Sequence, residues 1–547
     1  MYGIMQDRPL ALPHIFHRAE RLFGHKSITT SSPAGDVCAT YAQWSERVRR
    51  LATVLDSFGL APGARVGSFA WNTQRHLELY FAVPCTGRVL HTLNIRLFAD
   101  QIRYIIQHGG DQLLFVDRSV LPLVWPLAGQ LDCVRQWVVM DDGSDADLPD
   151  DKRVLDYEQL LAAAEPYPGR FEIADENTAA AMCYTSGTTG NPKGVVYSHR
   201  STVLHSLVSL TADTIGLSER DTVLPVVPMF HVNAWGLPYS AVLAGADLVL
   251  PGSSLAPQPL LEMIGRHRVT IAAGVPTIWL DAVPHLDQHD LSSLRMVVCG
   301  GSAVPKSLSE AWRERIGLPI TQAWGMTETS PLASFGSIRT HHDRLDQAGL
   351  AAARASQGQP VPLVDLRIVN PDTGNELPWD GTAFGELQAA GPWIAAGYLD
   401  HADTACTSDG WLRTGDVATI DRHGYVRLVD RTKDLIKSGG EWISSVELEN
   451  EIMAHPDVAE AAVIAKPHER WSERPVACVV LKGSVQVGPE DIIEHLRPRV
   501  AKWCLPDEVL IIDEIPKTST GKFSKKALRE RFYPQKTVAD PSNQQPQ

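Results

Sequence analysis

Short apolar runs alternate with amphipathic stretches along most of the chain. Residues 113–117 (LLFVD), 137–141 (WVVMD) and 294–301 (LRMVVCGG) have the length and composition of buried strands, whereas residues 41–59 repeat apolar positions with a helical period. Strands that alternate with helices in this way form sheets that are largely parallel. The pattern therefore predicts an α/β fold over the larger, N-terminal part of the chain.

The pattern changes twice toward the carboxyl end. Between about residues 365 and 430, the strand-like segments LRIVN, GELQAAG and GYVRLVD are separated by the turn-rich PDTG, DG and RHG, which predicts a small antiparallel β unit. Beyond Asp430 the pattern predicts a compact α+β domain. Its expected helices are residues 444–458 and 489–503, and its expected strands are residues 459–467 and 475–483.

Length, composition and charge narrow the class of protein. At roughly 150 residues per domain, the 547 residues suggest about three or four folding units. The net charge of −14 and the pI near 5.7 argue against a nucleic-acid or anionic-membrane partner, because such partners need a broad basic face. No segment approaches the roughly 18 apolar residues of a membrane span. We therefore expect no span, and peripheral membrane contact stays open.

Cysteine spacing and the first residues bear on the compartment. The 8 cysteines are scattered and form no CxxC pair, which disfavours a zinc site or a disulfide framework. Asp7, Arg8 and Glu20 interrupt the beginning of the chain, so it lacks the pattern of an export signal. We expect reduced thiols and a cytoplasmic location.

Residues 184–194, YTSGTTGNPKG, offer almost nothing to a core. They follow the apolar, strand-like residues 179–184, and a loop rich in glycine and hydroxyl groups can turn its backbone N–H groups toward a phosphate. Lys193 is followed by Gly194 rather than Ser or Thr, which disfavours a P-loop NTPase. A flexible linker is the plain alternative, but strand-like and helical patterns continue on the far side. The segment predicts a phosphate-binding loop.

Seven ordered segments resemble the motifs of the adenylate-forming superfamily, which includes acyl-CoA synthetases, luciferases and peptide-synthetase adenylation domains. They are YTSGTTGNPKG (184–194), PMFHVNAWG (228–236), GGSAVP (300–305), QAWGMTETSP (322–331), GWLRTGD (410–416), DRTKDLIKSGGEWISSVELE (430–449) and PKTSTGK (516–522). The resemblance covers nearly the whole chain. Within the superfamily, the sequence is most similar to bacterial medium- and long-chain fatty-acyl-CoA synthetases. It implies that a carboxylate attacks the α-phosphorus of ATP, pyrophosphate leaves, and the coenzyme A thiol then attacks the acyl-adenylate.

The resemblance also implies which residues bind the nucleotide. Those expected at the β- and γ-phosphates are Thr185, Ser186, Gly187, Thr188, Thr189, Gly190 and Lys193. Those expected at the adenine are Gly301, Ser302, Ala303 and Trp324, with Thr327 at the α-phosphate. Other residues expected to bind the nucleotide are Ala323, Gly325 and Met326. Thr185 and Glu328 would bind Mg²⁺, which prefers one or two carboxylates plus phosphates. Asp416 and Arg431 would bind the ribose. Trp324 stands where many relatives have tyrosine, and an ordinary core tryptophan is its alternative.

In the small domain the resemblance implies a catalytic residue and a hinge. Lys522 would place a cation at the developing charge of the adenylation step, although a solvated basic segment is the plain alternative. Asp430 would be the hinge, and Gly439 and Gly440 would line the pantetheine channel or form a plain turn. The resemblance also implies that Lys433, Lys437 and Trp442 contact the nucleotide or couple the two domains. The implied domains are an AMP-binding domain (1–429), a hinge (430–432), a C-terminal catalytic-lysine domain (433–535) and a disordered tail (536–547).

The acid pocket is expected around His231, Val232 and Trp235. His231 would lie at the carboxylate end as a catalytic residue or be a structural histidine, and Trp235 would gate an acyl tunnel or pack in the core. The segment has no carboxylate to pair with an ammonium group, which disfavours an amino-acid substrate. Without a carrier domain, free coenzyme A is the expected acceptor.

The expected activity is an ATP-, Mg²⁺- and coenzyme A-dependent ligase for a medium- or long-chain fatty acid, in a homodimer. A ligase for a short thio-substituted or aryl acid, such as 3-methylthiopropionate, is the first alternative. A catalytically silent nucleotide-binding protein is the second.

Overall fold

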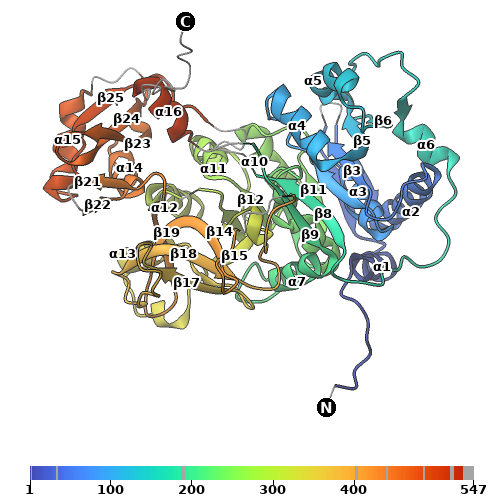
Figure 1. Ribbon diagram of the computed structural model, residues 1–547, viewed down its shortest axis with the longest axis horizontal. Coiled ribbons are helices and arrows are strands. Elements are labelled where there is room, and N and C mark those ends of the chain that lie inside the picture. The colour runs from blue at the N-terminus through green and yellow to red at the C-terminus, as the bar shows by residue number, and fades with distance from the viewer. Residues whose placement is uncertain are drawn as a thin grey trace, which may run out of the picture. The chain divides into compact units, whose positions relative to one another are not determined.

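Two compact units make up the part of the chain that the computed structural model describes, namely residues 1, 3–32, 35–185, 191–302, 304–400, 405–438, 441–483, 487–517 and 523–533. The first unit contains Met1–Thr414 and Ala418–Leu428, and the second contains Gly415–Val417 and the chain from Val429 on. The boundaries between the units fall within strands β19 and β20. Figure 1 labels many of the elements of both units.

One sheet of the first unit has the strand order β7-β6-β5-β3-β4-β8-β9. Its strands are β3 (Arg65–Phe69), β4 (Val89–Thr92), β5 (Asp111–Asp117), β6 (Gln136–Met140), β7 (Val154–Asp156), β8 (Ala179–Tyr184) and β9 (Gly194–Ser198). Neighbouring strands are parallel, except that β8 and β9 are antiparallel. The antiparallel pair is the stem of the predicted phosphate loop.

A second sheet of this unit has the order β16-β15-β14-β13-β12-β10-β11-β1-β2. Its strands are β1 (Ser27–Thr30), β2 (Val37–Thr40), β10 (Thr222–Pro225), β11 (Asp247–Leu250), β12 (Ile271–Gly274), β13 (Met296–Cys299), β14 (Ile320–Gly325), β15 (Leu332–Phe335) and β16 (Gln359–Pro360). Strands β10, β12, β13 and β14 are parallel neighbours. Their carboxyl ends therefore meet at one edge of the sheet, which is where open α/β sheets bind ligands.

A smaller sheet has the order β17-β18-β19-β20, with β17 (Asp365–Val369), β18 (Phe384–Ala390), β19 (Leu412–Ile420) and β20 (Val426–Arg431). The helices of the first unit are α1 (Leu12–Leu22), α2 (Tyr41–Ser57), α3 (Gln74–Cys85), α4 (Ala99–Gly109), α5 (Leu121–Val124), α6 (Tyr157–Ala163), α7 (His199–Ser209), α8 (Val232–Trp235), α9 (Leu237–Ala244), α10 (Pro257–Arg266), α11 (Pro276–Ala282), α12 (Lys306–Ile316) and α13 (Gln347–Arg354).

Helix α2 shows how the sequence specifies an element. The Thr40 hydroxyl accepts a hydrogen bond from the Gln43 N–H at 3.2 Å, and the Gln43 side chain accepts one from the Thr40 N–H at 2.8 Å. This capping box satisfies donors that the first turn would otherwise leave unpaired. Along the helix, Trp44, Val48 and Leu51 face the core with no exposed area. The helical period inferred from the sequence is thus confirmed.

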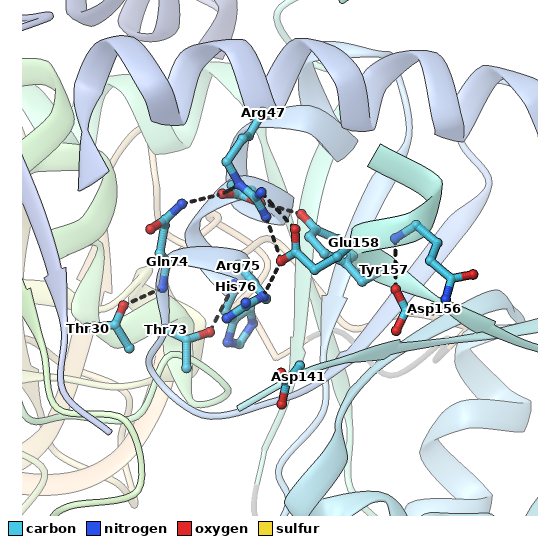
Figure 2. Close-up of polar contacts among 12 residues, drawn as sticks. Thr30, Arg47, Thr73, Gln74, Arg75, His76, Asp141, Asp156, Tyr157 and Glu158 are labelled. Carbon is cyan, nitrogen blue, oxygen red and sulfur yellow. Dashed lines mark hydrogen bonds and ion pairs between the residues drawn. The ribbon is translucent and has the colours of Figure 1, made fainter. Parts of the chain in front are cut away.

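Polar contacts among Arg47, Arg75 and Glu158 join α2, α3 and α6 (Figure 2). The Glu78 side chain is fully buried and accepts a hydrogen bond from Arg47 Nε at 2.6 Å. Arg47 also donates to Glu158 at 2.8 Å, and Arg75 donates to the same carboxylate at 2.7 Å. A buried charge is tolerated only with such partners. From the same helix, the Tyr80 hydroxyl donates to the Met229 carbonyl at 2.5 Å, so α3 also positions the predicted acid-pocket segment.

The second unit is a mixed sheet with helices. Its strand order is β22-β21-β24-β23, and β25 pairs with β24. The strands are β21 (Ile436–Ser438), β22 (Glu441–Ile443), β23 (Val458–His468), β24 (Ser472–Leu481) and β25 (Glu508–Ile511), and the helices are α14 (Ser445–Met453), α15 (Pro489–Leu496) and α16 (Lys525–Phe532). Ile452, Val463 and Ala477, with no exposed area, belong to its own core.

The predicted fold class is confirmed, with differences in detail. The helix expected at residues 444–458 ends at Met453. The helix expected at residues 489–503 ends at Leu496, close to Pro498, which has no N–H to continue the helical hydrogen bonds. Gly415–Val417, expected within the N-terminal region, packs with the second unit. Strand β19, Leu412–Ile420, was not among the strand-like segments expected in this region. Residues 536–547 lie outside the described residues. In the described part, every helix is too short or too polar to cross a bilayer.

Candidate active site

The stem of the predicted phosphate loop is closed by Thr185 and Lys193. Tyr184 pairs with Gly194 across β8 and β9. Beyond this pair, the Thr185 N–H donates to the Lys193 carbonyl at 2.9 Å, and the Lys193 N–H donates to the Thr185 hydroxyl at 3.1 Å. The strands therefore place the two predicted phosphate-binding residues side by side. The remaining predicted loop residues, Ser186, Gly187, Thr188, Thr189 and Gly190, lie outside the described residues.

Glu328 lies just beyond the carboxyl end of β14, in the short 3₁₀ turn Thr327–Thr329. It is 6% exposed, and its Oε1 accepts a hydrogen bond from the Tyr398 hydroxyl at 2.6 Å. The Thr327 carbonyl accepts a hydrogen bond from the Tyr197 hydroxyl at 2.8 Å. Burial, and then the Glu328 charge, raise the pKa of the Tyr398 phenol. The phenol therefore stays protonated and donates throughout the neutral range.

The backbone entering this turn leaves no room for a side chain at Gly325. A Cβ there would lie 1.7 Å from the Pro331 carbonyl oxygen. Met326, next along the chain, bonds through its N–H to the Thr329 hydroxyl at 2.8 Å. The glycine thus allows the sharp turn that places Thr327 and Glu328 at the sheet edge.

The predicted adenine-binding segments lie together at this edge. Gly301 and Ser302 follow β13, the parallel neighbour of β14. A Cβ at Gly300 would lie 2.6 Å from the Ala323 carbonyl oxygen and 3.4 Å from Cη2 of Trp235. The absence of a side chain at Gly300 therefore permits this close approach. Ala303 lies outside the described residues.

Trp324 is 6% exposed and packs within the main core of the first unit. A stacking role for Trp324 stays a prediction.

The predicted acid-pocket segment contains an unusual backbone. Val232, Asn233, Ala234 and Trp235 all have positive φ, between 47° and 58°, so α8 is a left-handed turn. This conformation costs roughly 1–2 kcal/mol for each residue other than glycine. His231 precedes the turn in extended backbone, and His231 and Trp235 are partly exposed while Val232 is buried. Tertiary contacts must offset the cost.

Asn233 provides part of that compensation. Its side-chain oxygen accepts hydrogen bonds from the Cys183 thiol at 2.8 Å and the Thr92 hydroxyl at 3.3 Å. Thr92 and Cys183 lie at the carboxyl ends of the parallel strands β4 and β8. Burial raises the pKa of Cys183 to about 11, so the thiol stays a proton donor. Asn233 was not identified from the sequence as a functional residue. The one sign of its role was a polar amide side chain within an otherwise apolar motif.

Asn72 positions the chain before His231. Its side-chain amide nitrogen donates to the carbonyls of Pro225 at 2.8 Å and Val227 at 2.9 Å, and its side-chain oxygen accepts from the Met229 N–H at 2.7 Å. Asn72 is 3% exposed. One amide therefore satisfies three backbone groups between β10 and the acid-pocket segment.

The second unit brings together two predicted ribose-binding residues. Arg431 Nε lies 3.1 Å from Asp416 Oδ1, and the two side chains are 46% and 7% exposed. The predicted hinge residue Asp430 is 4% exposed and accepts hydrogen bonds from the N–H and hydroxyl of Ser445 at 2.6 and 2.5 Å. Burial raises the pKa of Asp430, against the effect of the nearby Lys525 charge.

The other predicted residues of this unit are partly described. Lys437 Nζ lies 4.2 Å from the centroid of the Trp442 ring across the β21–β22 pair, a cation–π contact. Burial lowers the pKa of Lys433. Gly439, Gly440 and Lys522 lie outside the described residues.

The oxygen ligands that the described residues offer suit a metal cation that is bound mainly through substrate phosphates. Among the described residues, no group of three or more His, Cys, Asp or Glu side chains could bind a metal ion. Glu328 offers a buried carboxylate and Thr185 a hydroxyl oxygen, which are hard ligands of the kind Mg²⁺ takes beside substrate phosphates. These residues fit such an ion.

Parallel sheets whose carboxyl ends carry a hydroxyl-rich loop, a glycine-lined edge and a buried carboxylate define an adenylate-forming enzyme. The AMP-binding enzyme model matches residues 17–399, and the model of the AMP-binding enzyme C-terminal domain matches residues 447–522. The chain belongs to the AMP-binding enzyme family.

Relatives and solved structures match over nearly the whole chain. It is 48% identical to a long-chain-fatty-acid–CoA ligase of Thermus thermophilus (96% of each chain) and 45% identical to a 3-methylmercaptopropionyl-CoA ligase of Ruegeria pomeroyi (97% and 99%). Identity to a medium-chain-fatty-acid–CoA ligase of Ectopseudomonas oleovorans is 43% (97% and 98%). The structure of an anthranilate CoA ligase with anthranoyl-AMP aligns with a TM-score of 0.84 at 26% identity, covering 96% of this chain and 99% of that one.

Proposed function

We propose that this protein is an AMP-forming ligase that activates a medium- or long-chain fatty acid with ATP and transfers the acyl group to coenzyme A. The observation that carries the proposal is the pairing of Thr185 with Lys193 at the loop stem, together with the buried Glu328 carboxylate that shares Tyr398 with Lys193. Relatives at 43–48% identity, named as fatty-acid–CoA ligases and 3-methylmercaptopropionyl-CoA ligases, support it.

In the first step, a carboxylate oxygen of the acid forms a bond to the α-phosphorus, and the bond to the pyrophosphate oxygen breaks. Lys193 and the Thr185 hydroxyl bind the β- and γ-phosphates, and Lys522 provides a cation at the reacting carboxylate and α-phosphate. Glu328 and Thr185 would hold Mg²⁺, which would supply charge neutralisation at the phosphates. The small residues at Gly300 and Gly301 admit the adenine.

In the second step, the coenzyme A sulfur forms a bond to the acyl carbon, and the bond from that carbon to the phosphate oxygen of AMP breaks. AMP leaves with the electron pair, and the thiol proton is lost. Asp430 acts as the backbone hinge between the steps. Gly439 and Gly440 leave space for the thiol arm, and Asp416 and Arg431 bind the ribose.

The acid is tested by coenzyme A-dependent AMP formation over straight-chain acids from acetate to stearate, with benzoate and 3-methylthiopropionate alongside. We expect the highest kcat/KM with acids of medium or long chain. A clear preference for 3-methylthiopropionate or benzoate would replace the fatty acid with the alternative substrate class. Absence of acid-dependent pyrophosphate release with every acid would refute the ligase activity and favour a silent nucleotide-binding protein.

Lys522 is tested by separating the two steps. Lys522→Ala should lower acyl-adenylate formation by about 10²-fold or more, because it removes a cation from developing negative charge. Thioester formation from supplied acyl-adenylate should be unaffected. Lys526→Ala, at another lysine of the same segment, is the matched control. Equal loss of both steps would contradict the assigned role.

We also propose that the ligase requires Mg²⁺, is a homodimer formed through the first unit, and works in the cytoplasm without a nucleic-acid partner. The net charge of −14 supports the last point. Chelation of divalent cations should abolish adenylation, and readdition of Mg²⁺ should restore it. A monomeric mass in analytical ultracentrifugation would exclude the dimer.

A further inference from the structure

The segment at residues 391–400, GPWIAAGYLD, connects two parts of the candidate site. The Ala395 N–H donates to the backbone carbonyl of Glu328 at 2.7 Å. The Leu399 N–H donates to the carbonyl of Gly194, the residue after Lys193, at 2.8 Å. The segment therefore bonds to the predicted metal-binding turn and to the stem of the phosphate loop, with Tyr398 beside the second of these bonds.

The Tyr398 side chain contacts the functional groups themselves. Its hydroxyl donates to Glu328 Oε1 at 2.6 Å, and Lys193 Nζ lies 4.8 Å from the centroid of its ring. The hydroxyl and the ring face thus serve different partners. A negatively charged carboxylate accepts the hydrogen bond, and a positively charged ammonium lies over the ring, whose face is electron-rich.

This arrangement separates two opposite charges that the chemistry needs apart. If the Lys193 ammonium formed an ion pair with the Glu328 carboxylate, Lys193 would be less available to the nucleotide phosphates and Glu328 less available to the cation. The ring gives Lys193 another favourable position, and the hydroxyl uses one carboxylate oxygen while the second oxygen stays available to a cation. A phenol can do both because its ordinary pKa is near 10, so it remains a donor at neutral pH.

We infer that Tyr398 is a positioning residue that orients the Glu328 carboxylate toward the metal–nucleotide complex and spaces it from Lys193. The inference rests on the proposed function, because it assigns Glu328 to the cation and Lys193 to the phosphates. Sequence motifs gave no sign of it, since Tyr398 lies between two of the recognised motifs rather than within one. Tyr398 acts through Glu328 and Lys193 and does not itself react.

Tyr398→Phe tests the hydroxyl alone, because the ring that faces Lys193 stays. The probe is Mn²⁺, whose binding is followed by electron paramagnetic resonance with and without ATP. We expect Tyr398→Phe to weaken Mn²⁺ binding in the presence of ATP by about tenfold, the effect of one charge-assisted hydrogen bond. Binding of ATP in excess chelator, measured by calorimetry, should stay within about twofold of wild type.

Tyr398→Leu tests the ring as well. Since it removes the cation–π partner of Lys193, we expect it to weaken both Mn²⁺ binding and metal-free ATP binding. Tyr425→Phe is the matched control. The Tyr425 hydroxyl donates to the Ser337 carbonyl at 2.7 Å, so its loss removes a comparable bond without touching Glu328 or Lys193. Both nucleotide and Mn²⁺ affinities of the control should match wild type.

Two outcomes would overturn the inference. One is unchanged Mn²⁺ affinity in Tyr398→Phe. The other is an equal fall in Mn²⁺ and metal-free ATP binding in Tyr398→Phe, which would indicate a merely structural residue. The acid panel on the wild-type protein keeps the two proposals distinct. If the wild type forms acyl-CoA but Tyr398→Phe binds Mn²⁺ normally, the inference about Tyr398 is rejected and the proposed ligase function is not.

Discussion

Lys525 offers a sharp test of the second unit, because its ammonium is buried among acidic and hydroxyl groups. It lies 2.7 Å from Glu449 Oε1, with 12% and 10% of the two side chains exposed, and donates to the Ser445 hydroxyl at 2.5 Å. The same hydroxyl donates to the predicted hinge residue Asp430. Lys525 is also the first residue of α16, directly after the segment that contains Lys522.

Replacing Lys525 by methionine keeps the length of the side chain and removes its charge. Glu449 would then be a buried carboxylate bonded to the Val463 N–H, at 2.7 Å. Breaking a buried pair from one side costs about 3–5 kcal/mol. At about 1.4 kcal/mol per tenfold, opening of the second unit should become roughly 10²- to 4 × 10³-fold more frequent. The double variant Lys525→Met/Glu449→Gln should recover part of the loss, because the Glu449 charge is removed while Asp430 still lacks the nearby cation.

Hydrogen exchange followed by mass spectrometry on the full chain measures this effect locally. Amides of α14 and β23 should exchange faster in Lys525→Met, while those of α2 in the first unit serve as the internal control. If the amides of α14 and β23 exchange as slowly in the single variant as in the double variant, the ion pair does not contribute to the stability of the second unit. The reasoning would then be refuted.

The pH dependence has a defined sign. Burial, the largest cause, raises the pKa of both Glu449 and Asp430, while the Lys525 charge opposes the rise. A carboxyl group with a raised native pKa favours folding below its unfolded pKa, and this contribution is lost as pH rises through the native value. Without Lys525 the rise should be larger. The exchange defect of Lys525→Met should therefore be smaller near pH 5 than near pH 8.

Two further variants test the first and second units separately. Asn233→Leu removes the acceptor of the Thr92 and Cys183 hydrogen bonds, so the left-handed turn should relax. We expect the ratio of kcat/KM between long and short acids to change by about tenfold while the KM for ATP stays constant, and an unchanged ratio would contradict the role of the turn. Asp416→Asn removes a charged acceptor, and the KM for ATP should rise by about tenfold without altering acid preference. Normal ATP binding in this variant would exclude the ribose role.

Much of the fold was predictable because strand and helix periods are local. The apolar runs at residues 113–117 and 137–141 correspond to β5 and β6. The phosphate-loop stem was likewise predictable, since an apolar strand leads directly into Thr185. The helix beginning at Pro489 was predicted but its end at Leu496 was not, although the proline at residue 498 was visible.

The supporting residues of the site were not predictable from spacing. Tyr398 contacts Glu328 and Lys193 only because a segment distant in sequence from both returns to the sheet edge. The left-handed turn depends on Asn233 meeting Cys183, a residue of another strand. Such contacts arise from tertiary packing, which local propensity and period do not encode.

The amide of Asn72 and the turn at Asn233 have a consequence for chimaeric enzymes. Residues 225–236 carry the expected determinants of the acid, but their backbone is fixed from outside by Asn72, Thr92 and Cys183. If this segment alone were replaced by that of a relative with another substrate, the side chains of Asn72, Thr92 and Cys183 would have to form hydrogen bonds with different groups. We therefore expect acid specificity to depend on residues that are discontinuous in sequence, so that a graft succeeds only when Asn72, Thr92 and Cys183 are transferred with the segment.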